Sequence, residues 1–215
     1  MMSERSFVAE TFCGQVKMSK EKGKREMASD ARRKLLMEAA IACFVESGIS
    51  RTSMRDIAGK AGVSIGNLYN HFPGRDDLIA EIAKMDAVGL ADVVAQVAEC
   101  DTAQNAVDTF VKNYFVYCAD PVSAVLTVEI TSEALRNPAI ENLFSGNRAM
   151  LVGTLATIIS GCGLEKTRAT ETSGLVLDTI EGFALRVGLA GKKPRKRDVE
   201  ALLSFVRSTL PHHGD

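Results

Sequence analysis

The segment SIGNLYNHFPGR, residues 64–75, concentrates polar side chains of the kinds that bind nucleic acid. At a helix start, Ser64 would combine its hydroxyl with free backbone N–H groups, an arrangement suited to a phosphate. Asn67, in the first turn of that helix, can pair with a base edge, and Gly66 lets the backbone approach a duplex closely. Three further side chains can donate to phosphates and so position the helix without reading sequence: Tyr69, His71 and Arg75.

Two short helices joined by a tight turn are needed to present these side chains. The run TSMRDIA predicts the first helix, because Ser53 and Asp56 have the spacing of a capping box and Gly62 follows the run. Ser64 then caps the second helix, which we expect to continue to about His71 before a Pro-Gly pair ends it. A helix-turn-helix of this kind presents its second helix to the major groove of DNA.

Some residues of the segment have plain packing roles. Leu68 and Phe72 are best explained as core residues that hold the helices together. Tyr69 could pack there too, but its hydroxyl would then need a partner, so we favour phosphate contact. His71 has no companion ligands for a metal site.

An amphipathic helix precedes the motif. Apolar pairs recur every four residues in SDARRKLLMEAAIACFVESG, which predicts a helix that begins near Ser29 and ends at Gly48. Residues 1–27 lack this periodicity and are rich in charge, so we expect a mobile basic tail. The predicted helix-turn-helix DNA-binding domain therefore covers residues 28–75.

The rest of the chain, residues 76–215, reads as helices separated by short breaks, without a competing strand pattern. The predicted helices cover about residues 76–98, 103–118, 121–137, 139–160, 165–190 and 196–210. The expected fold class is all-α, with an N-terminal three-helix domain followed by a larger helical domain.

Residues 31–79, ARRKLLMEAAIACFVESGISRTSMRDIAGKAGVSIGNLYNHFPGRDDLI, closely resemble the N-terminal DNA-binding domain of the tetracycline-repressor (TetR) family. The first-helix pattern AA…F…G and the run T-S…IA..AGVS.G.LY.HF occur in register. The resemblance implies a homodimer that represses transcription from a near-palindromic operator and leaves the DNA when a small molecule enters its C-terminal domain. By position it implies DNA contacts by Thr52, Ser53, Arg55, Ser64, Ile65, Gly66, Asn67, Tyr69, His71 and Arg75. Ile65 stands where the family often has a polar or basic residue, so it either contacts a thymine methyl or shields the backbone.

The resemblance also gives residues 76–215 two tasks, ligand binding and dimerisation. The predicted helix SGLVLDTIEGFALRVGLAG is apolar nearly all round, and the last helix is amphipathic. Such a pair suits a four-helix bundle between two subunits. We expect the dimer interface to contain Leu175, Leu177, Ile180, Ala184, Val187, Leu202, Phe205 and Val206. Packing within one subunit is the alternative, and it would leave one face of the apolar helix exposed.

A ligand pocket between helices is usually apolar with a few polar groups. Its candidate walls are Phe110, Tyr114, Tyr117, Cys118, Phe144, Met150 and Phe183. Glu129 and Glu133, one helical turn apart with Ser132 beside them, could receive a cationic or hydroxylated ligand. Alternatively, Glu133 pairs with Arg136 or Arg148 as a structural ion pair.

Composition narrows the function further. Residues 17–75 carry twelve Lys or Arg against six acidic residues, although the whole chain has a net charge of −1. Only this N-terminal part is therefore suited to bind a polyanion. Five cysteines and three histidines show no metal-ligand or disulfide spacing. Without a Ser-His-Asp, metal or phosphate-loop signature, we expect no cofactor and no enzyme activity. Neither a long uncharged apolar run nor a signal-peptide core occurs, which predicts a cytoplasmic protein that does not bind membranes.

Alternatives to a ligand-released repressor stay open. A DNA-binding regulator could respond to a partner protein or to cysteine oxidation, and it could activate instead of repress. A helical carrier or enzyme is a third class. The basic loop GKKPRKR, residues 191–197, resembles a nucleic-acid patch in composition, but its position between two predicted dimerisation helices indicates a solvated loop.

Overall fold

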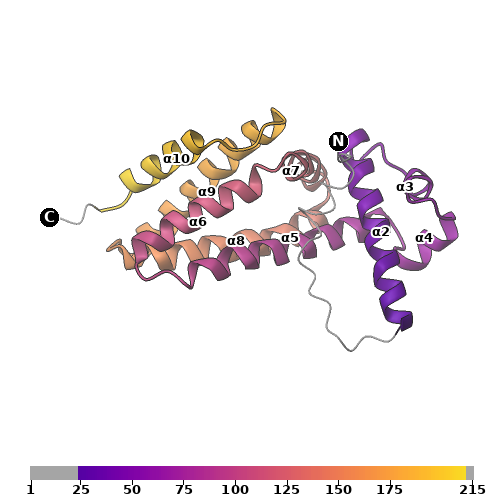
Figure 1. Cartoon of the computed structure of the whole chain (residues 1–215), viewed down its shortest axis with the longest axis horizontal. Coiled ribbons are helices and arrows are strands. Elements are labelled where there is room, and N and C mark those ends of the chain that lie inside the picture. The colour runs from indigo at the N-terminus through magenta and orange to yellow at the C-terminus, as the bar shows by residue number, and fades with distance from the viewer. Residues whose placement is uncertain (1–23, 212–215) are drawn as a thin grey trace. The chain divides into compact units, whose positions relative to one another are not determined.

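The computed structural model describes residues 24–211, and side chains from residue 29 onward, as helices joined by short turns (Figure 1). Among these residues no strand occurs, which confirms the predicted all-α fold. The helices are α2 (Lys24–Ser47), α3 (Met54–Ala61), α4 (Ile65–His71), α5 (Arg75–Val97), α6 (Ala103–Cys118), α7 (Pro121–Ala134), α8 (Pro138–Gly161), α9 (Lys166–Leu189) and α10 (Lys196–Ser208). The expected tail, residues 1–27, lies outside the described residues except for residues 24–27, which belong to α2.

The chain divides into two compact units. The first contains the chain up to Gly89 together with Leu126–Leu143, and the second contains Leu90–Val125 and the chain from Phe144 onward. Helices α5, α7 and α8 each contribute residues to both units. The predicted division after residue 75 therefore differs from the division that the contacts make, because the second half of α7 and the start of α8 group with the N-terminal helices.

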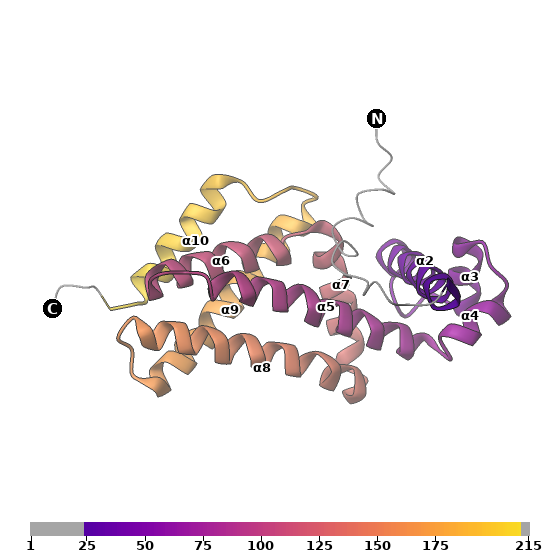
Figure 2. The same ribbon diagram turned by 60° about the horizontal axis from the view of Figure 1, so that its bottom comes forward.

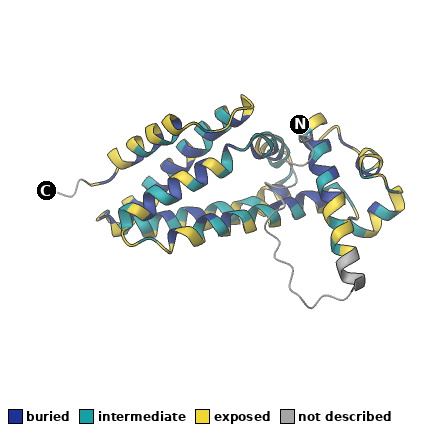
Figure 3. Ribbon diagram, in the orientation of Figure 1, coloured by how far each residue is buried: buried dark blue, intermediate teal, exposed yellow. Residues whose placement is uncertain are grey.

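Helix α2 supplies the central apolar face of the first unit. Leu36, Ala40 and Phe44 recur at helical spacing and are fully buried, and α3 packs beside α2 (Figures 1 and 2). Leu68 of α4 and Phe72 are fully buried as well, which confirms their predicted role in the core. Figure 3 shows buried residues recurring along the described part of α2. Burying a large apolar side chain contributes about 1.5–3 kcal/mol, so these contacts hold the short helices α3 and α4 in place.

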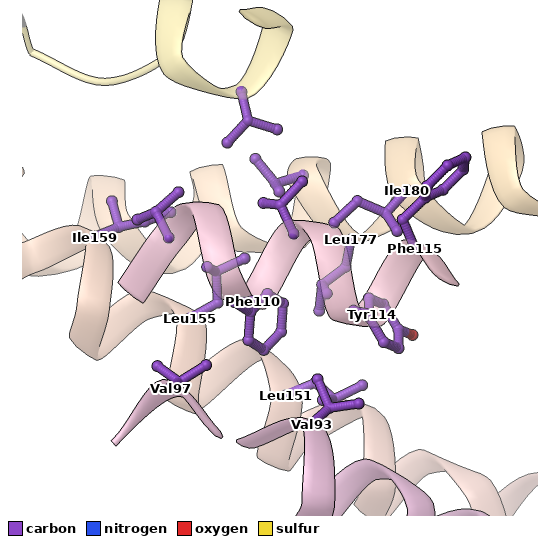
Figure 4. Packing of buried hydrophobic residues seen from close by; sticks show 14 of the residues in the cluster. Val93, Val97, Phe110, Tyr114, Phe115, Leu151, Leu155, Ile159, Leu177 and Ile180 are labelled. Atoms are coloured by element: carbon purple, nitrogen blue, oxygen red, sulfur yellow. The ribbon is translucent and has the colours of Figure 1, made fainter. Parts of the chain in front are cut away.

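The core of the second unit is formed by α6, α8, α9, α10 and the end of α5. Helix α6 lies beside both α9 and α10 (Figure 2). The side chains of Phe110, Leu151 and Leu155 point into one apolar interior (Figure 4). This unit therefore has a continuous core of its own.

Five of the eight residues predicted at a dimer interface lie in this core, each at most 3% exposed: Leu177, Ile180, Ala184, Leu202 and Val206. They pack within one chain because α9 and α10 bury these sides against α6 and the rest of the unit, which is the alternative that the sequence left open. Val187 is half-buried. Leu175 and Phe205 stay 69% and 49% exposed, so one face of each helix remains unpaired in the single chain.

Gly188 marks a close approach between α9 and the chain that leads from the end of α6 into the first turn of α7. A β-carbon at this position would lie 2.5 Å from the Ala124 Cβ and 3.2 Å from the Ala119 carbonyl oxygen. Carbon atoms do not approach one another so closely, so the backbones would have to separate.

We therefore expect Gly188→Ala to lower the free energy of unfolding by about 1–3 kcal/mol through overpacking. Gly153→Ala is the matched control, because Gly153 is exposed on α8 and a β-carbon there would touch nothing within 4 Å. It should raise the free energy of unfolding by about 0.5–1 kcal/mol, since alanine favours helix. Urea unfolding measures both variants, and equal effects would contradict the close approach.

Candidate nucleic-acid interface

Ser53 begins α3 with the predicted capping box. The backbone N–H of Asp56 donates to Ser53 Oγ at 3.2 Å, while the N–H and hydroxyl of Ser53 donate to Asp56 Oδ2 at 2.9 and 2.6 Å. The hydrogen bond from the Ser53 side chain, aided by that from its backbone, lowers the pKa of Asp56. Local sequence thus fixes the start of α3, where Ser53 and Arg55 remain exposed.

Gly62 ends α3, and Ser64 begins α4. Gly62 adopts φ +67°, a left-handed conformation that glycine takes without strain. Ser64 Oγ accepts a hydrogen bond of 3.2 Å from the Asn67 N–H. Both predicted helix boundaries are confirmed, and together they form a helix-turn-helix.

Helix α4 carries an exposed group of predicted contact residues. Ser64 and Gly66 are exposed, and a β-carbon at Gly66 would touch nothing within 4 Å. Ile65 and Tyr69 are 40% and 47% exposed, so packing inside the chain accounts for neither side chain fully. Asn67 is half-buried, and its Oδ1 is buried without a hydrogen-bond partner among the described residues.

Thr52 and Arg75 use their polar groups inside the protein. Thr52 is 5% exposed, and its hydroxyl donates to the Gly48 carbonyl at 2.7 Å. Arg75 Nη1 donates to the Ile49 carbonyl at 2.9 Å. Carbonyl groups at the end of a helix need such partners, so these two side chains stabilise the turn between α2 and α3 instead of extending freely toward solvent.

Arg33 joins the end of α4 to α5. Its guanidinium carbon lies 4.3 Å from the centre of the Phe72 ring, and Nη1 donates to the carbonyl of His71 at 3.1 Å. Nη2 and Nε donate to the Glu81 carboxylate at 2.7 and 3.4 Å. His71 itself is half-buried. This role of Arg33 was not predicted from the sequence, because no local spacing rule connects three positions so far apart in the chain.

The second unit contains a polar cluster, Tyr114, Arg148, Asp178 and Glu181, at the edge of its core. The Tyr114 hydroxyl donates to Glu181 Oε1 at 2.8 Å, and Arg148 Nη1 donates to both Glu181 oxygens at 2.9 and 3.1 Å. Arg148 Nη2 donates to Asp178 Oδ1 at 2.5 Å. Burial raises the pKa of both Glu181 and Tyr114. Of this cluster only Tyr114 was predicted, although a glutamate inside an otherwise apolar helix is a signal that could have indicated Glu181.

The predicted ligand-binding residues fall into two groups. Phe110 and Tyr114 are buried with ring centres 5.7 Å apart, and Phe183 stacks on Phe115 at 5.1 Å. Three other wall candidates of the second unit are half-buried: Tyr117, Cys118 and Phe144. Met150 is exposed.

Glu129, Ser132 and Glu133 lie in the first unit instead. Glu129 accepts from the Ile49 N–H at 2.8 Å, and Ser132 Oγ accepts from Arg136. The proposed pairing of Glu133 with Arg136 or Arg148 is wrong: Glu133 lies 4.0 Å from Arg75, because α7 packs on the N-terminal helices.

An open hollow of about 580 Å³ lies beside the start of α3, lined by Thr52, Met54, Pro73, Gly74, Arg75, Asp76 and Asp77. It belongs to the first unit and is not the pocket predicted for residues 76–215. Across residues 24–211 no cluster of three or more potential metal ligands is present. None of the described helices is long and apolar enough to span a membrane.

This geometry defines a protein with a helix-turn-helix domain of the kind used by DNA-binding regulators. Residues 36–82 match the family model described as bacterial regulatory proteins, tetR family. This N-terminal segment is therefore of the tetR-family type, which confirms the resemblance found in the sequence for residues 31–79.

Individual relatives agree with this assignment. The repressor KstR2 of Mycobacterium tuberculosis is 40% identical over 55 residues, 26% of this chain and 28% of that protein. The repressor AcnR of Corynebacterium diphtheriae is 34% identical over 65 residues, 30% of this chain and 34% of that protein. The chain thus spans about a third or less of the length of these relatives.

Solved structures extend the likeness of fold to most of the chain. GusR of Salmonella enterica has a TM-score of 0.70 at 23% identity, covering 84% of this chain and 95% of that one. FadR of Bacillus subtilis, solved in complex with stearoyl-CoA, has a TM-score of 0.68 at 18% identity, covering 82% and 98%. Both units therefore have counterparts among structures of transcriptional regulators.

The Arg33–Glu81 ion pair predicts a pH dependence of stability. The hydrogen bond from Arg33 lowers the pKa of Glu81 against the opposing effect of burial. A carboxyl whose pKa is lowered by folding stabilises the protein at neutral pH, and this contribution is lost as the pH falls through the folded-state pKa. Glu81→Gln should therefore lower the free energy of unfolding by about 0.5–1 kcal/mol at neutral pH, with a smaller difference in acid.

Chemical denaturation of both proteins at neutral and acidic pH measures this difference. Glu99→Gln, at an exposed position of the chain, is the control and should change stability at neither pH. A difference between wild type and Glu81→Gln that persists undiminished in acid would contradict the role of the ionised carboxylate.

Proposed function

We propose that the protein is a transcriptional repressor that binds a near-palindromic operator through α3 and α4 and leaves it when a small molecule binds the second unit. One observation carries the proposal. In a tetR-family domain, six residues on two consecutive helices or at their N-caps are exposed to solvent: Ser53, Arg55, Ser64, Ile65, Gly66 and Tyr69. Such a protein acts by binding, without catalysis, and works in the cytoplasm where the DNA is.

The exposed residues divide into two kinds of contact. We assign Arg55 and Tyr69 to phosphates, which set affinity and position, and we place Ile65 and Asn67 near base edges. Ser53 already donates its N–H and its hydroxyl to Asp56 within the capping box. We do not assign Thr52 and Arg75 to direct DNA contacts, since their polar atoms already bind carbonyl groups of the turn. They support the interface from behind.

The proposed effector site is the aromatic part of the second unit beside the polar cluster. Phe110 and Phe183 belong to the apolar core there, and Tyr114 with Glu181 provides hydrogen-bonding groups that a ligand could engage by displacing Arg148. FadR of Bacillus subtilis is a related fold solved with stearoyl-CoA, which supports a small-molecule trigger as a class. Oxidation of Cys43 or Cys162 is less well supported, because burial raises the pKa of both thiols and so lowers the fraction present as the reactive thiolate.

A homodimer would bring two recognition helices to successive major grooves, about 34–36 Å apart. We propose that the exposed faces of α9 and α10 form this interface, since Leu175, Leu189 and Phe205 are large apolar residues left at least 49% exposed.

Replacing Leu175 and Phe205 together by Asp should convert the dimer into monomers, because two charges would be buried without partners. Sedimentation equilibrium measures the mass. The control Leu135→Asp changes an 82% exposed residue of the first unit and should leave the dimer intact. An unchanged mass in the double variant would exclude this interface.

Selection of bound fragments from genomic DNA by the purified protein, at two salt concentrations, tests the function. A near-palindromic motif that survives the higher salt supports a specific regulator. Weak binding without a motif, erased by salt, would refute it.

On the selected duplex, Arg55→Ala should lower affinity about fivefold or more and reduce the slope of log affinity against log salt by about 1. Tyr69→Phe should weaken binding by a smaller factor. Arg197→Ala, in the first turn of α10 at the end of the basic loop sequence GKKPRKR, is the matched control and should change neither quantity. Fluorescence anisotropy of labelled duplex measures all three, and a loss confined to Arg197→Ala would move the interface to that loop.

A further inference from the structure

The turn between α2 and α3 is held at both backbone polar groups of Ile49. Its N–H donates to Glu129 Oε2 at 2.8 Å, and its carbonyl accepts from Arg75 Nη1 at 2.9 Å. Ile49 is fully buried, so its N–H could not bind solvent if Glu129 were removed, whereas its carbonyl also accepts from the Thr52 N–H at 3.2 Å. A buried backbone group left without a partner is strongly unfavourable.

The turn is shaped to receive the carboxylate. Gly48 adopts φ +86°, and a β-carbon there would lie 3.0 Å from Glu129 Oε2 and 3.3 Å from Oε1. Any other residue would meet both backbone strain and the carboxylate itself. Glu129 therefore occupies a place that the glycine leaves open.

Glu133 adds a second contact from the same helix. It lies one turn after Glu129 in α7, and its carboxylate is 4.0 Å from Arg75 Nη2, with only 13% of its side chain exposed. We call Glu129, Glu133 and Arg75 the turn clamp. Two of its members come from α7, a helix that begins in the second unit and ends in the first.

The clamped turn leads directly into the proposed DNA-contacting surface. Thr52 donates to the Gly48 carbonyl and is followed at once by Ser53, the cap of α3. A shift of Ile49 would therefore move the start of α3, including Arg55. Because phosphate and base contacts depend on placement to within a fraction of an ångström, such a shift weakens binding without removing any contact residue.

We propose that Glu129 is a positioning residue for DNA binding: its carboxylate fixes the turn between α2 and α3, and through it the start of α3. The inference rests on the proposed function. Nothing requires Glu129 to touch DNA, so its loss should lower affinity while leaving the number of phosphate contacts unchanged.

Three substitutions at one position separate this role from general stabilisation. Glu129→Ala removes the acceptor, Glu129→Gln keeps an oxygen that can accept from Ile49, and Glu129→Asp keeps the charge on a shorter side chain. Thr131→Ala, at an exposed position of α7, is the matched control. Binding to the selected duplex is measured by anisotropy over a range of salt, at a temperature where circular dichroism shows each variant fully folded.

We expect Glu129→Ala to lower affinity on the order of tenfold with an unchanged salt slope. Glu129→Gln should stay within about twofold of wild type, because a neutral acceptor still satisfies the buried N–H. Hydrogen exchange of the Ile49 amide should accelerate on the order of tenfold in Glu129→Ala and not in Glu129→Gln. If Glu129→Ala does not fold, Glu129→Asp decides, with an expected loss of affinity and the same salt slope.

Wild-type affinity in a folded Glu129→Ala or Glu129→Asp variant would overturn the inference. Equal losses in the Ala and Gln variants, or a changed salt slope, would also overturn it. Those results leave the proposed function standing, because the wild type still binds the duplex. If the wild type itself selects no duplex, the proposed function fails, and that outcome is distinct.

Discussion

The position of α4 depends on one side chain of another helix, Arg33. Stacked on the Phe72 ring and bonded to the carbonyl of His71, it meets α4 where the helix ends. Its pair with Glu81 ties the same point to α5. A helix as short as α4 is not stable alone in water. The exposed residues at its start can therefore face a partner only because Arg33, Leu68 and Phe72 hold the other side.

The turn around Ile49 in the first unit and the polar cluster of the second unit satisfy their polar groups in different ways. In the first unit, side chains satisfy backbone groups of tight turns: Thr52, Arg75 and Glu129 bind carbonyl and amide groups near Ile49. In the second, side chains satisfy one another, as Tyr114 and Arg148 do around Glu181. The first arrangement fixes backbone geometry, which DNA recognition needs. The second leaves groups that a ligand could take over without unfolding a helix.

Local signals in the sequence predict the helices and the break between α3 and α4. The capping box of Ser53 and Asp56, the glycine at position 62 and the cap at Ser64 all act over three or four residues, so they can be read without the fold. Glu129 could not be assigned in this way, because its partner Ile49 lies 80 positions earlier. Leu177 and Val206 likewise lie on apolar helix faces that would suit either a subunit interface or a core. Only their packing with α6 shows that they belong to the core.

The central claim, that the starts of α3 and α4 contact DNA, is tested most directly by hydrogen exchange of the whole chain with and without the selected duplex. If these helix starts contact DNA, the amides of residues 52–56 and 64–71 should exchange more slowly when DNA is bound, and exchange in the basic loop sequence at residues 191–197 should be unchanged. Protection confined to that loop or to the second unit, with residues 52–56 and 64–71 unaffected, would contradict the claim.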